Sequence, residues 1–197
     1  MAVRILAARE RQAAAWKNGG GVTREVAAYP PGAGLADFAW RVSFAKVAEG
    51  GPFSVFEGVD RIITLVAGRG MELVVDGAAT RVERPFEPFA FRGDAVVDCR
   101  LLDGPITDFN VMARRGEVGA VVEIVTAHRE LTAELGSTVL VVALGGAVTV
   151  AWQGDEPVKV ALERYDAVEL TDGASGTIEP DGVVAVVTLT RERDAHE

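Results

Sequence analysis

The sequence predicts an all-β protein built from many short strands. About a dozen runs rich in β-branched and aromatic residues follow one another along the 197 residues. Glycine, proline and aspartate separate these runs at intervals of about 8–12 residues, which is typical of β-sandwiches and barrels. Several runs alternate apolar and polar side chains, as strands with one buried face do.

The elements are expected to be short strands joined by tight turns. The chain begins with a strand at 3–6 and a segment, 7–15, whose Ala, Arg, Glu and Gln content favours two helical turns. Another helical turn is expected at 130–135. Gly68-Arg69-Gly70 and Asp76-Gly77 are hairpin signals. The remaining strands are expected at 22–29, 38–47, 53–56, 61–67, 71–75, 80–83, 95–102, 108–114, 118–125, 139–144, 148–152, 158–162, 167–170, 176–178 and 183–190.

The two halves of the chain resemble each other. Residues 65–77 align with 142–154, and the same shift places Asn110-Val111-Met112 opposite Val187-Thr188-Leu189. The sequence of a double-stranded β-helix, the cupin or jelly-roll fold, has the same order: a strand, a glycine turn, a second strand and an Asp-Gly turn. The prediction is therefore a two-barrel bicupin in one chain, with one barrel at 1–117 and a degenerate barrel at 118–197, packed as one compact unit.

Only the first half carries polar groups at the repeated positions. Asp108 and Asn110 correspond to Ala185 and Val187 in the second half. The second half therefore reads as structural, and the ligand site is expected in the first.

Composition excludes several classes of partner. The net charge of −9 argues against nucleic acids and anionic membranes, since both attract basic surfaces. The sequence contains no apolar run of 18 residues and no signal peptide, so we expect a cytoplasmic protein. Cys99 is the only cysteine and cannot form an internal disulfide, which fits a reducing compartment. It lies in an apolar run, so we interpret it as a small buried hydrophobe rather than a nucleophile.

The sequence also argues against a transition-metal site. Metal-binding cupins use several histidines with a glutamate, whereas His128 and His196 are the only histidines here. No metal and no cofactor are expected, and the shortage of histidine weakens the case for His-based acid–base catalysis.

Trp16-Lys17-Asn18-Gly19-Gly20-Gly21 with Thr23-Arg24-Glu25 is the densest group of unusual residues. Consecutive glycines allow positive φ and close approach of another group. The motif is open to two interpretations: a ligand loop, or a tight turn with Trp16 packed over it and an Arg24–Glu25 pair on its rim.

Arginines spaced among the strands suggest an anionic ligand. Arg binds carboxylates through two parallel hydrogen bonds, and Arg24, Arg41, Arg61 and Arg114 all lie in or beside expected strands. Asn110 could read an amide or formyl group, because its side chain both donates and accepts. The alternative for each arginine is an internal salt bridge.

At these residues the sequence resembles the HutD/Ves family. The resemblance rests on the 16–25 motif, Trp40-Arg41-Val42-Ser43, Gly51-Pro52-Phe53-Ser54 through Arg61, Gly68-x-Gly70-Met71, and 101–105 with 108–112. It covers residues 3 to 115 strongly and the rest more loosely. It implies a cupin-like, two-barrel fold without the metal ligands. Family members often accompany histidine-degradation genes and are thought to bind an intermediate such as N-formylglutamate or urocanate and to restrain pathway flux.

The leading interpretation is a non-enzymatic binder of a small carboxylate that modulates histidine utilisation. The alternative is a metal-independent isomerase or hydrolase that uses Lys17 or Glu25 as acid or base. A homodimer through strand edges is left open. The expected ligand-binding residues are Trp16, Lys17, Asn18, Arg24, Glu25, Trp40, Arg41, Ser43, Arg61 and Asn110.

Overall fold

The structure, a computed structural model, describes residues 2–153 and 157–192. This part of the chain consists of strands and one short 3-10 segment, so the all-β prediction is confirmed. Two compact units emerge, one of residues 11–117 and one of residues 1–10 with 118–197. We call them the N-terminal unit and the C-terminal unit. His196, one of the two histidines counted above, and Gly154, the last residue of the aligned segment 142–154, lie outside the described residues.

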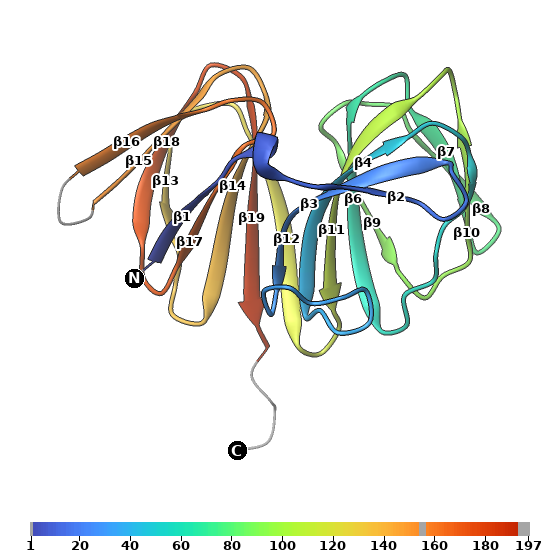
Figure 1. Cartoon of the computed structure of the whole chain (residues 1–197), viewed down its shortest axis with the longest axis horizontal. Helices are drawn as coiled ribbons and strands as arrows, with labels where there is room; N and C mark the ends of the chain where they lie inside the picture. The colour runs from blue at the N-terminus through green and yellow to red at the C-terminus, as the bar shows by residue number, and fades with distance from the viewer. Residues whose placement is uncertain (1, 154–156, 193–197) are drawn as a thin grey trace. The chain divides into compact units, whose positions relative to one another are not determined.

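The N-terminal unit contains two antiparallel sheets (Figure 1). One has the order β2-β3-β4-β11-β6-β9, and the other has the order β5-β10-β7-β8. The strands are β2 (Ala13–Ala15), β3 (Gly21–Tyr29), β4 (Trp40–Val47), β5 (Gly51–Pro52), β6 (Val59–Ala67), β7 (Met71–Val75), β8 (Ala78–Val82), β9 (Pro88–Arg92), β10 (Val97–Leu101) and β11 (Ile106–Arg114).

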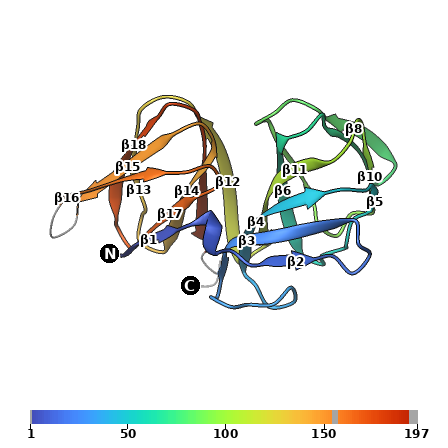
Figure 2. The same cartoon turned by 45° about the horizontal axis from the view of Figure 1, so that its top comes forward.

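The C-terminal unit also contains two antiparallel sheets, ordered β1-β17-β14-β19-β12 and β13-β18-β15-β16 (Figure 2). Its elements are β1 (Ala2–Leu6), η1 (Ala8–Glu10), β12 (Val118–Val125), β13 (Arg129–Thr132), β14 (Ser137–Gly145), β15 (Val148–Gln153), β16 (Pro157–Leu162), β17 (Ala167–Thr171), β18 (Ser175–Pro180) and β19 (Val183–Arg191).

The two units repeat one strand order. The run β4-β11-β6-β9 of the first corresponds to β12-β19-β14-β17 of the second, and β5-β10-β7-β8 corresponds to β13-β18-β15-β16. The matched strands β6–β7 and β14–β15 carry the segments that align in sequence. The internal repeat in the sequence is therefore a repeat of topology.

The boundary expected for the first barrel is wrong at its N-terminal end. Strand β1 pairs along its whole length with β17, from Ala2 with Thr171 to Leu6 with Ala167. Residues 1–10 therefore belong to the C-terminal unit. A single apolar strand does not specify its partner, so the sequence could not assign it.

Both helical expectations are also wrong. Within residues 7–15 the chain forms only η1 and then β2, which pairs with β3. Residues 129–132 form β13, which pairs with β18. Short segments of helical composition are marginal as helices, and pairing to a neighbouring strand overrides that preference.

Side chains from both sheets of the N-terminal unit form a large apolar core. It includes Ala45 from β4, Ile63 and Leu65 from β6, and Leu73 from β7. Cys99 of β10 is buried in this core, as predicted, and burial raises the pKa of its thiol to about 11. The thiol is therefore un-ionised at neutral pH.

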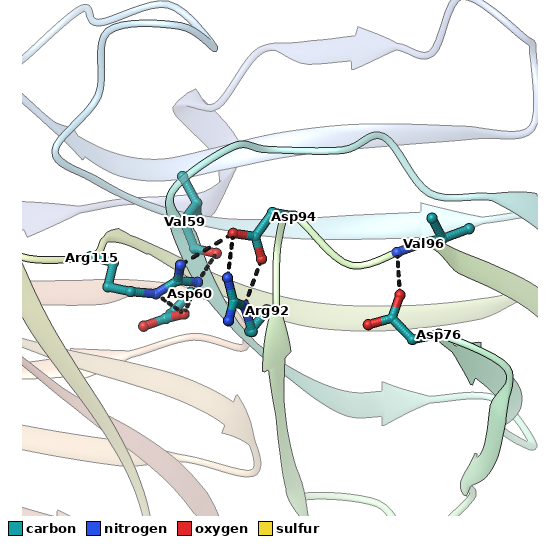
Figure 3. A network of polar contacts seen from close by, with 7 residues as sticks. All are labelled: Val59, Asp60, Asp76, Arg92, Asp94, Val96 and Arg115. Atoms are coloured by element: carbon teal, nitrogen blue, oxygen red, sulfur yellow. Dashed lines mark hydrogen bonds and ion pairs between the residues drawn. The ribbon is translucent and has the colours of Figure 1, made fainter.

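An ion-pair network joins the ends of strands in the N-terminal unit (Figure 3). Arg115 reaches Asp60 at 2.6 Å and Asp94 at 3.1 Å, and Arg92 donates two hydrogen bonds to Asp94 at 2.8 and 2.9 Å. These hydrogen bonds hold the pKa of Asp94 well below its usual range. The network spans β6, the β9–β10 loop and the end of β11, so we assign it a structural role.

Candidate functional site

Polar side chains interrupt the core of the N-terminal unit on four neighbouring strands. Register places Glu25 of β3 beside Ser43 of β4, and Ser43 beside Asn110 of β11. Arg41 and Arg61 lie on either side of Met112, also on β11.

These residues share the face that carries the core. Side chains alternate along a strand, so Ser43 lies on the same face as the core residue Ala45, and Arg61 on the same face as Ile63. Asp108 follows the core residue Ile106 in the same way. We call the following group the interior polar cluster: Glu25, Arg41, Ser43, Arg61, Asp108 and Asn110.

Arg61 is the most constrained member of the cluster. Its residue surface is 6% exposed, and its guanidinium lies 5.1 Å from the ring centre of Phe53, 5.7 Å from that of Phe56 and 5.0 Å from that of Phe91. Burial lowers its pKa to about 10; the charge of Asp108 opposes this shift and that of Arg41 adds to it. The group therefore stays cationic at neutral pH, held by aromatic faces.

Asp108 is buried close to this cation. Its residue surface is 3% exposed, and burial raises the pKa of its carboxyl to about 7, against the opposing effect of Arg61. A carboxyl with such a pKa changes charge near neutral pH, whereas an ordinary aspartate is fully ionised there.

Three buried atoms of the cluster have no hydrogen-bond partner among the described residues. They are Nε of Arg61, Oδ1 of Asp108 and Oδ1 of Asn110. A buried polar atom without a partner costs about 1–3 kcal/mol. With Asp108 ionised, the three atoms comprise one donor and two acceptors, which suits a ligand with complementary groups.

Arg41 and Glu25 form the outer end of the cluster. Arg41 Nε donates to Glu25 Oε2 at 2.7 Å. The Arg41 side chain is 14% exposed and that of Glu25 is 40% exposed, so this pair reaches solvent. One interpretation of the sequence was an ion pair between Arg24 and Glu25, but Glu25 pairs with Arg41 instead.

The glycine motif forms the hairpin loop between β2 and β3. The Trp16 indole donates to Thr23 Oγ1 at 2.8 Å, and its ring packs against the core. Asn18 Oδ1 accepts from the Gly20 amide at 3.1 Å, and Lys17 is exposed. The turn interpretation therefore accounts for Asn18, while Trp16 packs beside the face that carries the cluster.

Substitution of Gly21 tests how tightly this loop is packed. A Cβ there would lie 2.7 Å from the Lys46 carbonyl oxygen and 3.0 Å from the Trp16 ring. We expect Gly21→Ala to lower the free energy of unfolding by about 1–3 kcal/mol, because the strand or the indole must shift. Urea denaturation measures this change.

Gly20→Ala is the matched control. The nearest atom to a Cβ at Gly20 is Asn18 Oδ1 at 3.5 Å, an ordinary contact. Its free energy of unfolding should change by less than half as much. Equal losses in the two variants would contradict the packing of Trp16 against Gly21.

Some expected site residues lie outside the cluster. Arg24 is exposed and Trp40 is buried beside Tyr29, with ring centres 6.3 Å apart. Both lie on the face opposite to Glu25 and Arg41, their neighbours in sequence. Arg24 and Trp40 therefore lie outside the interior polar cluster, although the sequence analysis expected them in one site with Glu25 and Arg41. Arg114 is also outside it, since it donates to the backbone carbonyls of Phe38 and Ala36 at 3.2 and 3.0 Å.

Asp108 is the cluster member that the sequence did not place among the ligand-binding residues. The signal was present: Asp108 shares its strand face with Asn110, and the repeat has Ala185 at the matching position. Its burial and its proximity to Arg61 required the structure.

The described residues contain no group of three His, Cys, Asp or Glu side chains arranged to hold a metal ion. The same residues include no helix long and apolar enough to cross a membrane. A hollow of about 310 Å³ lies elsewhere on the unit, lined by residues of 80–84 and 87–89. It includes no member of the cluster.

Comparison with known proteins identifies the family. A sequence model described as HutD matches residues 8–187. The chain belongs to the HutD family. A Pseudomonas putida protein named "Uncharacterized 21.2 kDa protein in hutC 3'region" is 39% identical over 168 residues, covering 85% of this chain and 86% of that protein. Protein Ves of Citrobacter koseri is 38% identical over 144 residues, covering 71% and 74%.

Solved structures agree with this family and define the fold. HutD from Pseudomonas fluorescens SBW25, in a formate condition, has a TM-score of 0.85 at 34% identity, covering 98% of this chain and all of that one. Ylba from E. coli has a TM-score of 0.71 at 8% identity, covering 99% and 93%. Oxalate decarboxylase from Bacillus subtilis has a TM-score of 0.64 at 7% identity, covering 96% and 77%. At such low identity the last two likenesses show fold alone, and the fold of this HutD-family chain is cupin-like.

Proposed function

We propose that this HutD-family protein binds a small carboxylate at the interior polar cluster. The observation that carries the proposal is Arg61, a buried guanidinium whose Nε lacks a partner in the described chain. A buried cation is costly unless an anion compensates it, and a planar guanidinium matches a carboxylate through two hydrogen bonds. Asp108 supplies part of this compensation, but its own pKa is raised, so a ligand carboxylate complements Arg61 better.

The family context suggests which carboxylate. The family name HutD and the relative named for the hutC region link the family to histidine utilisation. We therefore propose N-formylglutamate or urocanate as the ligand and modulation of histidine utilisation as the role. The setting would be the cytoplasm, and a homodimer through strand edges stays a proposal.

We also propose that each unit is a cupin barrel, which makes the chain a bicupin. The shared strand order supports this. Ala185 and Val187 replace Asp108 and Asn110 in the C-terminal unit, so the second barrel would be degenerate and the ligand would bind only in the first.

A metal-independent isomerase or hydrolase is the second candidate, and Asp108 is the observation that favours it. General acid–base catalysis works best when the pKa is near the operating pH, and burial raises the pKa of Asp108 to about 7. Lys17 is exposed on the loop and Glu25 is paired with Arg41, so Asp108 is the stronger acid–base candidate. Product formed from N-formylglutamate or urocanate, and abolished by Asp108→Asn, would establish an enzyme.

A thermal-shift screen tests the binding proposal. Purified protein is heated with N-formylglutamate, urocanate, glutamate, histidine or EDTA. A ligand at about 100 times its Kd adds about 2.7 kcal/mol, which raises Tm by several degrees in a chain of this size. We expect such a rise with N-formylglutamate or urocanate. A lowered Tm with EDTA and no rise with any acid would contradict the proposal and indicate a metal.

A further inference from the structure

We infer that the site selects carboxylates that also carry an N–H donor, and that Asp108 and Asn110 accept a hydrogen bond from that donor. This inference rests on the proposed function and adds a requirement to it. Arg61 accounts for the binding of an anion, whereas Oδ1 of Asp108 and Oδ1 of Asn110 determine which anions bind most tightly.

The two acceptors lie together on β11. Asp108 and Asn110 are two residues apart on one strand, so both side chains lie on the interior face, about 7 Å apart along the backbone. Their residue surfaces are 3% and 9% exposed, and Oδ1 of each has no partner among the described residues. A buried acceptor of this kind is satisfied only by an N–H or O–H group.

Among the residues that the structure describes, neighbouring side chains do not supply that donor. Burial and, to a smaller extent, the charge of Asp108 raise the pKa of the Cys99 thiol, but this thiol contacts Met71 Sδ at 3.8 Å. Arg61 interacts electrostatically with Asp108, yet its Nε has no partner among the described residues. The Arg41 Nε–H is used by Glu25 at 2.7 Å.

Donor and acceptors therefore lie on adjacent strands of one face. Register pairs Ile63 of β6 with Asn110 and pairs Arg61 with Met112, so Arg61 lies two residues from the position opposite Asn110. A small acid can offer its carboxylate to Arg61 and a nearby N–H to β11. Acylamino acids and imidazole acids have this arrangement, whereas simple dicarboxylates such as glutarate do not.

Isothermal titration with matched acids tests the inference. N-formylglutamate is compared with 2-(formyloxy)pentanedioic acid, in which an ester oxygen replaces the N–H without added bulk. Urocanate is compared with 3-(furan-3-yl)acrylate, and glutarate serves as the plain dicarboxylate. For at least one pair we expect the N–H acid to bind at least about 10-fold tighter than its analogue, since an unpaired buried acceptor faces the analogue.

Two variants that introduce residues of the C-terminal unit at the matching positions distinguish this inference from the proposed function. Asp108→Ala and Asn110→Val introduce the residues found at Ala185 and Val187, and circular dichroism checks that both variants fold. The preference for the N–H acid should fall below about threefold in Asp108→Ala, while glutarate binding persists. Equal affinities within both pairs in the wild-type protein would overturn the inference and leave carboxylate binding intact. Absence of binding by every acid would overturn both.

Discussion

Replacing Arg61 by methionine is expected to weaken carboxylate binding at least about 100-fold. A hydrogen bond to a charged group contributes about 1.5–3 kcal/mol, and a guanidinium can make two such bonds to one carboxylate. Methionine fits among Phe53, Phe56 and Phe91 and removes a buried charge, so the variant should fold. Isothermal titration with N-formylglutamate and urocanate measures the loss.

Two further variants control this experiment. Arg24→Met removes an exposed cation from the opposite face of β3 and should change Kd less than about twofold. Arg61→Lys keeps the positive charge but loses the planar pair of donors, so its affinity should lie between those of Arg61→Met and the wild type. Wild-type affinity in Arg61→Met would remove the basis of the proposed site.

Replacing Asp108 by asparagine is expected to stabilise the protein at pH 8. The pKa of this carboxyl is raised by burial to about 7 in the folded state, from 3.8 in its usual setting. Because the pKa of Asp108 is higher in the folded than in the unfolded protein, protonation of this carboxyl favours folding. This stabilisation is fully present below the unfolded pKa, and it is lost as pH rises from there through the folded pKa of about 7. At pH 8 the folded wild type therefore carries a buried charge that costs up to about 4 kcal/mol, at 1.36 kcal/mol per pKa unit.

Urea denaturation at pH 5.5 and pH 8 measures this effect. The gain in free energy of unfolding from Asp108→Asn should be larger at pH 8 than at pH 5.5, because the wild-type carboxyl is mostly protonated at the lower pH. Comparing the two proteins at each pH cancels the other titrating groups. A variant that is less stable than the wild type by the same amount at both pH values would contradict the burial of an ionisable Asp108. A residue that costs stability at neutral pH is expected where function maintains it.

Strand alternation predicted which of the candidate residues share a strand face, because it depends only on local spacing. It placed Asp108 with Asn110 and put Arg41 on the polar face of its strand. Adjacent residues such as Trp40 and Arg41 cannot share a face, so a candidate set containing both could not form one site. Choosing between Arg24 and Glu25 required the register of β3 against β4, which includes a shift between Glu25 and Ala27.

Other features depend on long-range pairing, which a single sequence does not specify. Strand β1 pairs with β17 across more than 160 residues, and nothing in residues 2–6 identifies that partner. The segment 7–15 has helical composition but contributes β2, because β3 offers it an edge. The raised pKa of Asp108 follows from burial, and burial became evident only once both sheets were assembled around it.

The most direct test of carboxylate binding at the cluster is the arginine Nε–H signal of Arg61 in an NMR titration. The protein is labelled with ¹⁵N-arginine, and the signal is assigned by its loss in Arg61→Lys. Addition of N-formylglutamate or urocanate should shift the Arg61 Nε–H resonance downfield and slow its exchange with water, while the Arg24 signal stays in place. An Arg61 signal unchanged at a saturating concentration of an acid that binds would show that the carboxylate binds elsewhere.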